Sequence, residues 1–292
     1  VSNIVFEDGV TSSFSMDALT PYGGRRTRIM GTMGFIEGDG KKVLHTGDLR
    51  EHGFLGKGLE PTLQKWMTEV DVLITEGTML SRDDEQTKTE REIQSLMHEY
   101  MQQYKNVLVL CSSTNFDRLA GLHKANQRFD NRPFVCDVYQ SIQLETLSRF
   151  CGKHSDLYRI TRVEEMSLGN ERLHQRMVEN GFTMLVRDNG KFRKWLDHLM
   201  PMLDPEQTVL IYSQLQEFVS LYGKNMAYVH TSGHATRKAL EKICRIVNPS
   251  TAIIPIHRDP ASDFMTLDIS DELKQKITES SICRNGIEIL ID

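Results

Sequence analysis

The chain has 292 residues, of which 39% are hydrophobic and 26% are charged, a composition typical of a globular protein. It has neither an apolar run of the roughly 18 residues that a membrane-spanning helix needs nor a basic and apolar leader, so we expect a cytoplasmic protein without a membrane partner. The formal net charge of −5 argues against a uniformly basic, nucleic-acid-binding surface, although a local patch or a bound cation can take that role.

Short apolar runs that end in small polar residues alternate with amphipathic stretches along the chain, and this alternation predicts an α/β fold. The runs 32–36 and 42–44 flank the turn sequence Glu-Gly-Asp-Gly, which predicts a hairpin. Further apolar runs predict buried strands, and they lie at 72–74, 107–110, 209–212 and 253–256.

Helices are predicted between these strands. Thr89 and Glu92 have the spacing of a capping box, and the helix that follows carries one apolar stripe. We expect the stripe to face the core; it consists of Ile93, Leu96, Met97, Tyr100, Met101 and Tyr104. A second helix with the same periodicity runs from Ala239 to Val247 and stops at the Asn-Pro pair that follows.

The cysteines are odd in number and widely spaced, and none belongs to a CxxC pair. This argues against a disulfide framework and against a thiolate zinc site, and it fits a reducing compartment. We expect most of the thiols to lie in the core; they are Cys111, Cys136, Cys151, Cys244 and Cys283.

Four polar residues with metal-binding or acid–base chemistry follow predicted strands: Asp48, Glu76, His234 and His257. Open α/β sheets build their sites from the segments just after strand ends. A carboxylate oxygen and an imidazole suit borderline cations such as zinc, and a carboxylate can also orient a histidine. Each residue taken alone is also compatible with a turn, a helix cap or a satisfied core histidine.

Two short segments are candidates for binding phosphate. His230, Ser232 and Gly233 lie with His234 in a predicted strand-to-helix turn, whose backbone N–H groups suit an anion. Ser112 and Ser113 follow another strand, where they can hold phosphate oxygens or cap the next helix.

Taken together, six motifs resemble the β-CASP group of metallo-β-lactamase fold nucleases, and RNase J-like proteins in particular. They are VLHTGDLREHG (43–53), DVLITEGT (71–78), VLCSSTNFDRL (109–119), RPFVCD (132–137), HTSGHA (230–235) and AIIPIH (252–257). The resemblance spans about Thr27 to Phe264. It implies a partial αββα metallo-β-lactamase sandwich with an inserted α/β cap domain. The expected boundaries are 1–80 and 224–292 for the sandwich and 81–223 for the cap.

The resemblance also implies roles for the strand-end residues. Asp48 matches the Asp that bridges two metals, and His257 matches a ligand of the second metal. His234 matches a histidine that helps to protonate the leaving group, and Glu76 matches an acidic residue that supports a histidine. The implied substrate is RNA, the implied metal is zinc with manganese as the alternative, and homodimers are common in the family. Neither exonuclease nor endonuclease action is specified.

The chain departs from the family because it contains no HxHxDH motif, and it has no histidine about 20 residues before Asp48, where Arg28 or Thr27 stands. We therefore expect this chain alone to lack a complete two-metal site and to be inactive. The Val1 start favours a chain without the N-terminal part of the fold. Arg28, with Arg25 and Arg26, favours a degenerate relative that binds phosphate directly.

Three other functions stay open at this point. The first is a non-catalytic RNA-binding or scaffold relative of the same fold. The second is a serine hydrolase using Ser232 or Ser113 with His234, although no G-x-S-x-G motif is present. The third is a hydrolase of small phosphodiesters or lactams, against which the cap-sized insertion argues.

Overall fold

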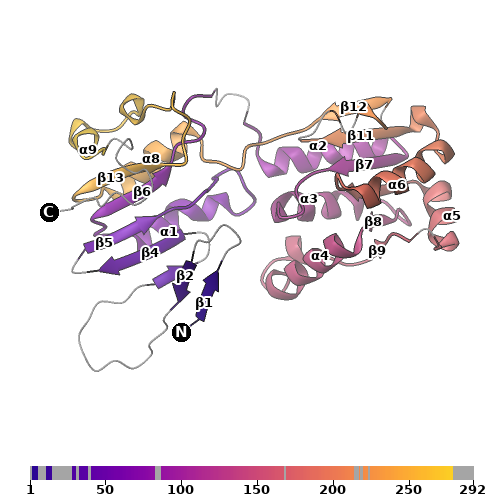
Figure 1. Cartoon of the computed structure of the whole chain (residues 1–292), viewed down its shortest axis with the longest axis horizontal. Coiled ribbons are helices and arrows are strands. Elements are labelled where there is room, and N and C mark those ends of the chain that lie inside the picture. The colour runs from indigo at the N-terminus through magenta and orange to yellow at the C-terminus, as the bar shows by residue number, and fades with distance from the viewer. Residues whose placement is uncertain are drawn as a thin grey trace. The chain divides into compact units, whose positions relative to one another are not determined.

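The computed structural model describes residues 2–5, 11–14, 28–30, 33–38, 41–82, 87–167, 169–213, 217, 220–222 and 224–278 (Figure 1). The chain divides into two compact units. The first comprises residues 1–51, 55–86 and 233–292, and the second comprises residues 52–54 and 87–232. Of the arginine cluster, Arg25 and Arg26 lie outside the described residues, as does Cys283.

The first unit is built on a five-stranded mixed sheet with the order β13-β6-β5-β4-β3 (Figure 1). Its strands are β3 (Arg28–Met30), β4 (Met33–Gly38), β5 (Lys41–His45), β6 (Val72–Glu76) and β13 (Ala252–Ile256). β4 and β5 form the predicted antiparallel hairpin, whereas β5, β6 and β13 run parallel. A separate antiparallel pair consists of β1 (Ser2–Val5) and β2 (Thr11–Phe14).

The described part of this unit also contains the helices α1 (Leu59–Trp66), α8 (Arg237–Val247) and α9 (Asp271–Gln275). Their apolar faces share one core with the sheet, in which Leu63 and Leu240 pack with Leu73. α8 begins at the cap residue Thr236 and ends at Asn248, whose left-handed backbone precedes the proline. The helix predicted from Ala239 to Val247 is therefore confirmed.

The second unit contains a six-stranded sheet with the order β12-β11-β7-β10-β8-β9, in which every neighbouring pair is parallel (Figure 1). The strands are β7 (Asn106–Leu110), β8 (Phe134–Cys136), β9 (Val163–Glu165), β10 (Phe182–Val186), β11 (Thr208–Tyr212) and β12 (Asn225–Tyr228). The central strands are buried on both faces, which explains their continuous apolar runs.

Helices cover both faces of this sheet. They are α2 (Glu90–Gln103), α3 (Phe116–Asn126), α4 (Val138–Cys151), α5 (Glu171–Asn180) and α6 (Gly190–Leu199). Alternate residues of β7 serve different cores, since Val107 packs with helices α2 and α3 while Leu108 packs with α5 and α6. The predicted α/β class is confirmed; the division into a metallo-β-lactamase sandwich and a cap domain stays a prediction.

Burial suppresses the reactivity of most thiols. Cys111, Cys136 and Cys244 are buried, and burial raises their pKa values to about 11, 12 and 12. Because a thiolate is the form that binds metal, these cysteines are poor ligands. Cys151 is exposed. Among the described residues, no helix is long and apolar enough to cross a bilayer.

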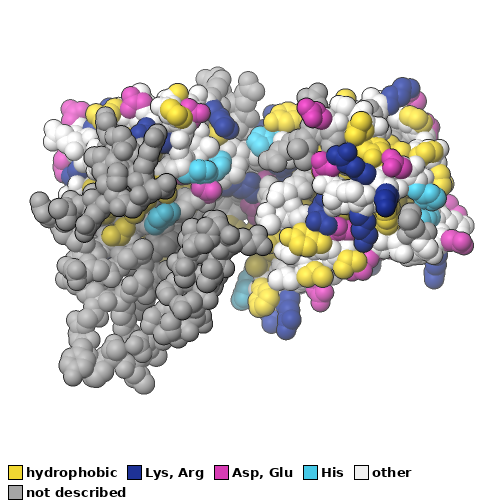
Figure 2. Space-filling model, viewed as in Figure 1, with side chains coloured by type: hydrophobic (Ala, Val, Ile, Leu, Met, Phe, Trp, Pro, Cys, Tyr) yellow, Lys and Arg dark blue, Asp and Glu magenta, His cyan; other side chains and the backbone are white. Residues whose placement is uncertain are grey.

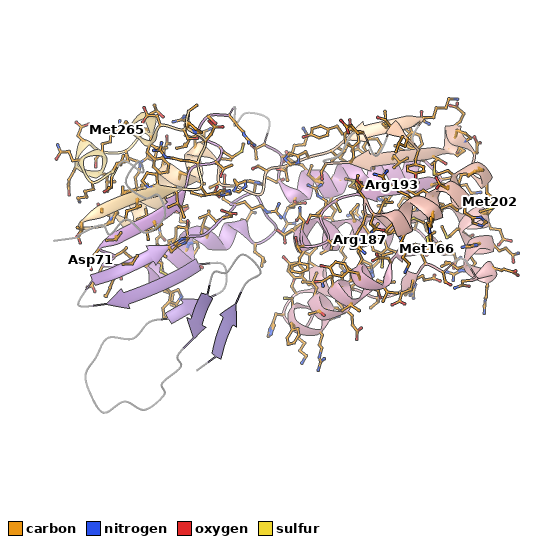
Figure 3. The ribbon with its side chains drawn as sticks, in the orientation of Figure 1. Asp71, Met166, Arg187, Arg193, Met202 and Met265 are labelled. Atoms are coloured by element: carbon orange, nitrogen blue, oxygen red, sulfur yellow. The ribbon has the colours of Figure 1, made fainter. Side chains whose placement is uncertain are left out.

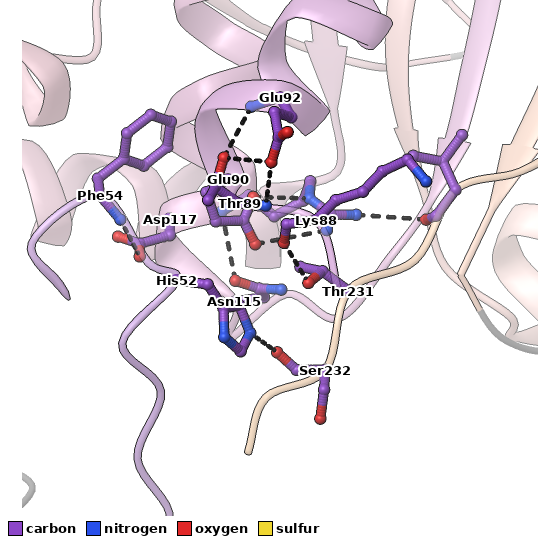
Figure 4. Close-up of polar contacts among 12 residues, drawn as sticks. His52, Phe54, Lys88, Thr89, Glu90, Glu92, Asn115, Asp117, Thr231 and Ser232 are labelled. Atoms are coloured by element: carbon purple, nitrogen blue, oxygen red, sulfur yellow. Dashed lines mark hydrogen bonds and ion pairs between the residues drawn. The ribbon is translucent and has the colours of Figure 1, made fainter. Parts of the chain in front are cut away.

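A buried ion pair joins α2 to α3 in the second unit (Figure 4). Arg118 donates from Nε to Glu90 Oε2 at 3.0 Å and from Nη1 to the carbonyl of Val229 at 3.4 Å, and both side chains of the pair are almost fully buried. Thr89 caps the N-terminus of α2 and forms the predicted capping box with Glu92. Removing one partner of such a pair leaves a buried charge without compensation.

We expect Glu90→Ala to lower the free energy of unfolding of the second unit by about 3–5 kcal/mol. The chain has two tryptophans, Trp66 in the first unit and Trp195 in the second, so Trp66→Phe leaves a fluorescence signal from the second unit alone. Urea unfolding in that background measures the change. Glu206→Ala, which breaks the exposed pair with Lys224, is the control and should barely move the midpoint. Equal shifts for the two variants would contradict the argument.

Candidate functional site

The parallel strands β5, β6 and β13 end at the same edge of the first sheet, and their ends carry three of the predicted site residues. Glu76 is the last residue of β6, Asp48 follows β5, and His257 follows β13 directly. His234 joins them from the segment that leads into α8. Donor atoms of these four residues all lie within 4.8 Å of one another.

Glu76 is the buried member of this cluster, with no exposed surface. Its Oε1 accepts hydrogen bonds from the backbone N–H groups of Leu49 and Ala235, both at 3.1 Å. Its Oε2 lies 2.7 Å from Nδ1 of His234. At this distance the carboxylate can accept the Nδ1 proton of the imidazole, an arrangement that leaves Nε2 to exchange a proton with a ligand. Glu76 is thus placed to act as a positioning residue for His234.

Asp48 and His257 are the exposed members. Asp48 Oδ1 lies 2.8 Å from His257 Nδ1, and the two side chains are 57% and 55% exposed. Carboxylate oxygen and imidazole nitrogen are both ligands that zinc accepts, so this pair can bind a cation from solvent.

The backbone around His257 is shaped to present its ring. His257 has a φ of +40°, a left-handed conformation that is uncommon for residues other than glycine. Thr78 Oγ1 donates a hydrogen bond to the His257 carbonyl at 2.8 Å. A Cβ atom at Gly77 would lie 2.4 Å from the buried ring of Phe264, so a larger residue there would displace that ring. Thr78 was not among the residues predicted from the sequence; its position after a strand end, two residues beyond Glu76, was the available signal.

The donor set fits one divalent cation better than two. Asp48 and His257 were the two ligands expected from the sequence, and a catalytic zinc uses at least three protein ligands. The rings of His234 and His257 are 5.1 Å apart, so an imidazole that can transfer a proton lies beside the two expected ligands. An imidazole with a carboxylate favours zinc over magnesium or calcium, which prefer oxygen ligands.

The predicted phosphate contacts Ser112 and Ser113 lie at the carboxyl end of β7 in the second unit. There β7 leads to β8 on one side and β11 leads to β12 on the other, which is the topological switch point where open α/β sheets bind ligands. The hydroxyl of Ser112 lies 2.9 Å from that of Thr114. Asn115 caps α3, so the capping role falls to Asn115 rather than to the serines.

His230 and Ser232 follow β12, at the carboxyl edge of the same sheet. The exposed ring of His230 stacks on Tyr228 at 5.9 Å. Ser232 is buried, and its carbonyl lies 2.6 Å from Nε2 of His52 (Figure 4). Gly233 is exposed and belongs to the first unit, so the five predicted phosphate contacts are divided between the units.

A scan of the chain against known protein families finds no match, and no curated protein matches it either. The likeness to β-CASP nucleases therefore rests on the motifs themselves.

Proposed function

We propose that this protein is a metal-dependent phosphodiester hydrolase that acts on RNA with one cation, in contrast to the inactivity expected from the absence of the HxHxDH motif. The observation that carries the proposal is the gathering of two histidines and two carboxylates, from segments up to 209 residues apart, at one edge of the first sheet. One carboxylate is buried and oriented, whereas the other is exposed beside a histidine. A buried carboxylate that orients a histidine and an exposed carboxylate that can bind a cation are typical of a hydrolytic metal site with its own proton donor.

Asp48 and His257 would hold the cation, which when bound lowers the pKa of a water molecule and polarises the phosphate. Glu76 fixes the ring of His234 through Nδ1. Nε2 of His234 can then deliver a proton to the departing oxygen of the cleaved bond. Ser112, Ser113, His230, Ser232 and Gly233 are the proposed contacts to further phosphates of the strand.

The alternative is a non-catalytic relative that binds RNA without a metal. It is favoured by the small number of ligands, since Asp48 and His257 alone hold zinc weakly. The two functions differ in a measurable way, because a hydrolase needs the cation for turnover and a scaffold does not need it for binding.

The first test is cation binding by the full chain, measured by competition with a chromophoric chelator for Zn²⁺ and by calorimetry for Mn²⁺. We expect one saturable site that is lost in Asp48→Asn and in His257→Ala, because each removes a ligand. Glu76→Gln should change cation binding much less, because Glu76 contacts the proton donor His234 and neither of the two ligands. His154→Ala and Asp271→Asn, which change exposed residues elsewhere, are the matched controls. Unchanged binding in His257→Ala would remove the metal assignment.

The second test is cleavage of an end-labelled single-stranded RNA with excess Zn²⁺ or Mn²⁺. We expect His234→Ala to lower kcat by about 10²- to 10⁴-fold with little change in KM, because a proton donor acts in the transition state. Glu76→Gln should lower kcat in the same way, since it releases the ring of His234. RNA binding that is equal with EDTA and with cation, without any cleavage, would instead support the scaffold.

A further inference from the structure

Helix α4 of the second unit exposes apolar side chains on the face that points away from the core. Its inner face packs in the core through Leu144 and Leu147. Its outer face carries the apolar side chains of Tyr139, Ile142 and Phe150. Together with Thr146 they are spaced by three or four residues, so they form one stripe along the helix, and Phe150 is 66% exposed. A contiguous apolar patch on a surface marks a site of interaction.

Basic side chains accompany the two aromatic rings of this face. The guanidinium of Arg187, labelled in Figure 3, lies over the ring of Tyr139 at 4.5 Å. That of Arg149 lies over the ring of Phe150 at 5.8 Å. In Figure 2 hydrophobic side chains gather beside Lys and Arg side chains on the part of the second unit where Figure 1 shows α4.

A pocket of about 400 Å³ opens beside the apolar face. It is lined by Glu145, Ser148 and Arg149 of α4 and, from the segment leading into β9, by Thr161 and Arg162. Neither Arg149 nor Arg162 forms an ion pair with any residue that the structure describes. Since these two guanidinium groups outnumber the one carboxylate of the lining, that of Glu145, the pocket favours an anionic ligand.

The segment that carries Arg162 is held rigidly. The backbone N–H of Ile160 donates to Ser148 Oγ at 3.1 Å, and Gln127 Nε2 donates to Thr161 Oγ1 at 3.2 Å. His123 Nε2 lies 2.7 Å from the carbonyl of Thr161. Arg162 itself has a φ of +56°, a conformation that is unfavourable for arginine and persists only where the surroundings impose it. These contacts therefore hold the backbone that carries Arg162 beside the pocket.

We infer that the face of α4 and the adjoining pocket, together the α4 surface, bind single-stranded RNA, an inference that rests on the proposed function for the choice of RNA. Exposed aromatic rings stack on bases, and arginines contact both phosphates and bases. The pocket has the size of a small-molecule site and can take one nucleotide. The carboxylate of Glu145 can accept a hydrogen bond from the ribose 2′-hydroxyl, which DNA lacks.

Charge distinguishes RNA from a second copy of this chain as the occupant. In the segment that forms the α4 surface, Arg149 and Arg162 line the pocket with one carboxylate, Glu145, and Asp156 pairs with Arg159, whereas the whole chain has a net charge of −5. A two-fold interface would place this basic segment against itself, and like charges repel. A polyanion meets it with the opposite charge.

The test is the affinity of the full chain for a fluorescein-labelled single-stranded RNA, measured by anisotropy in EDTA so that no cleavage occurs. Phe150→Ala should raise Kd about 5- to 150-fold, the effect expected when one base can no longer stack. The double variant Arg149→Ala/Arg162→Ala should reduce the slope of log K against log salt concentration by about 1.4, or about 0.7 for each phosphate that is no longer neutralised. DNA of the same sequence should bind several-fold more weakly.

The matched control is Lys65→Ala/Trp66→Ala, which removes another exposed aromatic ring with a cation over it, on α1 of the first unit. It should leave Kd unchanged. Light scattering after size exclusion completes the experiment. A mass that halves in Phe150→Ala would identify a second copy as the occupant and overturn the inference, and so would unchanged RNA affinity in both α4 variants or equal affinity for DNA.

These outcomes are separable from those of the proposed function. If the α4 variants lose RNA affinity while wild-type protein shows no cation-dependent cleavage, the α4 surface stands and the hydrolase fails. If cleavage depends on Asp48 and His257 while the α4 variants bind RNA normally, the hydrolase stands and the α4 surface fails.

Discussion

The carboxylate of Glu76 holds the candidate site together. It has no exposed surface, so its charge has to be compensated by neighbouring donors. Two backbone N–H groups, from Leu49 and Ala235, and the ring of His234 supply that compensation. Through one side chain, the segments after β5, at the end of β6 and before α8 are therefore fixed to one another. A change at Glu76 would disturb all three segments, which makes it the centre of the site although it is the member furthest from solvent.

Around this fixed centre the remaining groups are free to bind. Asp48 and His257 are more than half exposed, and they face each other rather than the core. Each pair consists of a carboxylate and a histidine, but the roles differ. Glu76 positions His234, whereas Asp48 and His257 can bind a cation. The difference in exposure follows from the position of each residue along its strand. Glu76 is the last residue of β6, whereas Asp48 and His257 lie in the turns after β5 and β13.

The second unit uses buried charge in another way. Glu90 and Arg118 neutralise each other between α2 and α3, and Arg132 donates to the carbonyls of Met101, Tyr104, Lys105 and Phe182. Burial lowers the pKa of Arg132 to about 10. These contacts join helices to the ends of strands and so hold the helices against the parallel sheet. Helix α4 packs against this sheet with one face. Its other face is not covered by the described residues of its own unit, and that exposed face forms part of the α4 surface.

Much of the fold and of the site could be predicted from the sequence by itself. The capping box at Thr89, the end of the helix after Val247 and the hairpin before Val43 depend on residues that are close in the sequence. Such features can therefore be predicted without knowledge of the tertiary structure. The apolar runs predicted buried strands because a strand covered on both faces must be apolar throughout. Asp48, Glu76, His234 and His257 were recognisable because each follows such a run.

Only the tertiary structure decided how these residues act. The order of β5, β6 and β13 in the sheet arises from pairing between segments about 180 residues apart, which no local pattern encodes. That pairing buried Glu76 against two amides and His234 and left Asp48 and His257 in solvent. The exposure of Phe150 and the left-handed backbone of Arg162 are likewise properties of packing. The sequence determined which chemistry the chain carries at its strand ends, and the long-range contacts determined which groups meet, because burial and hydrogen bonding depend on neighbours that are distant along the chain.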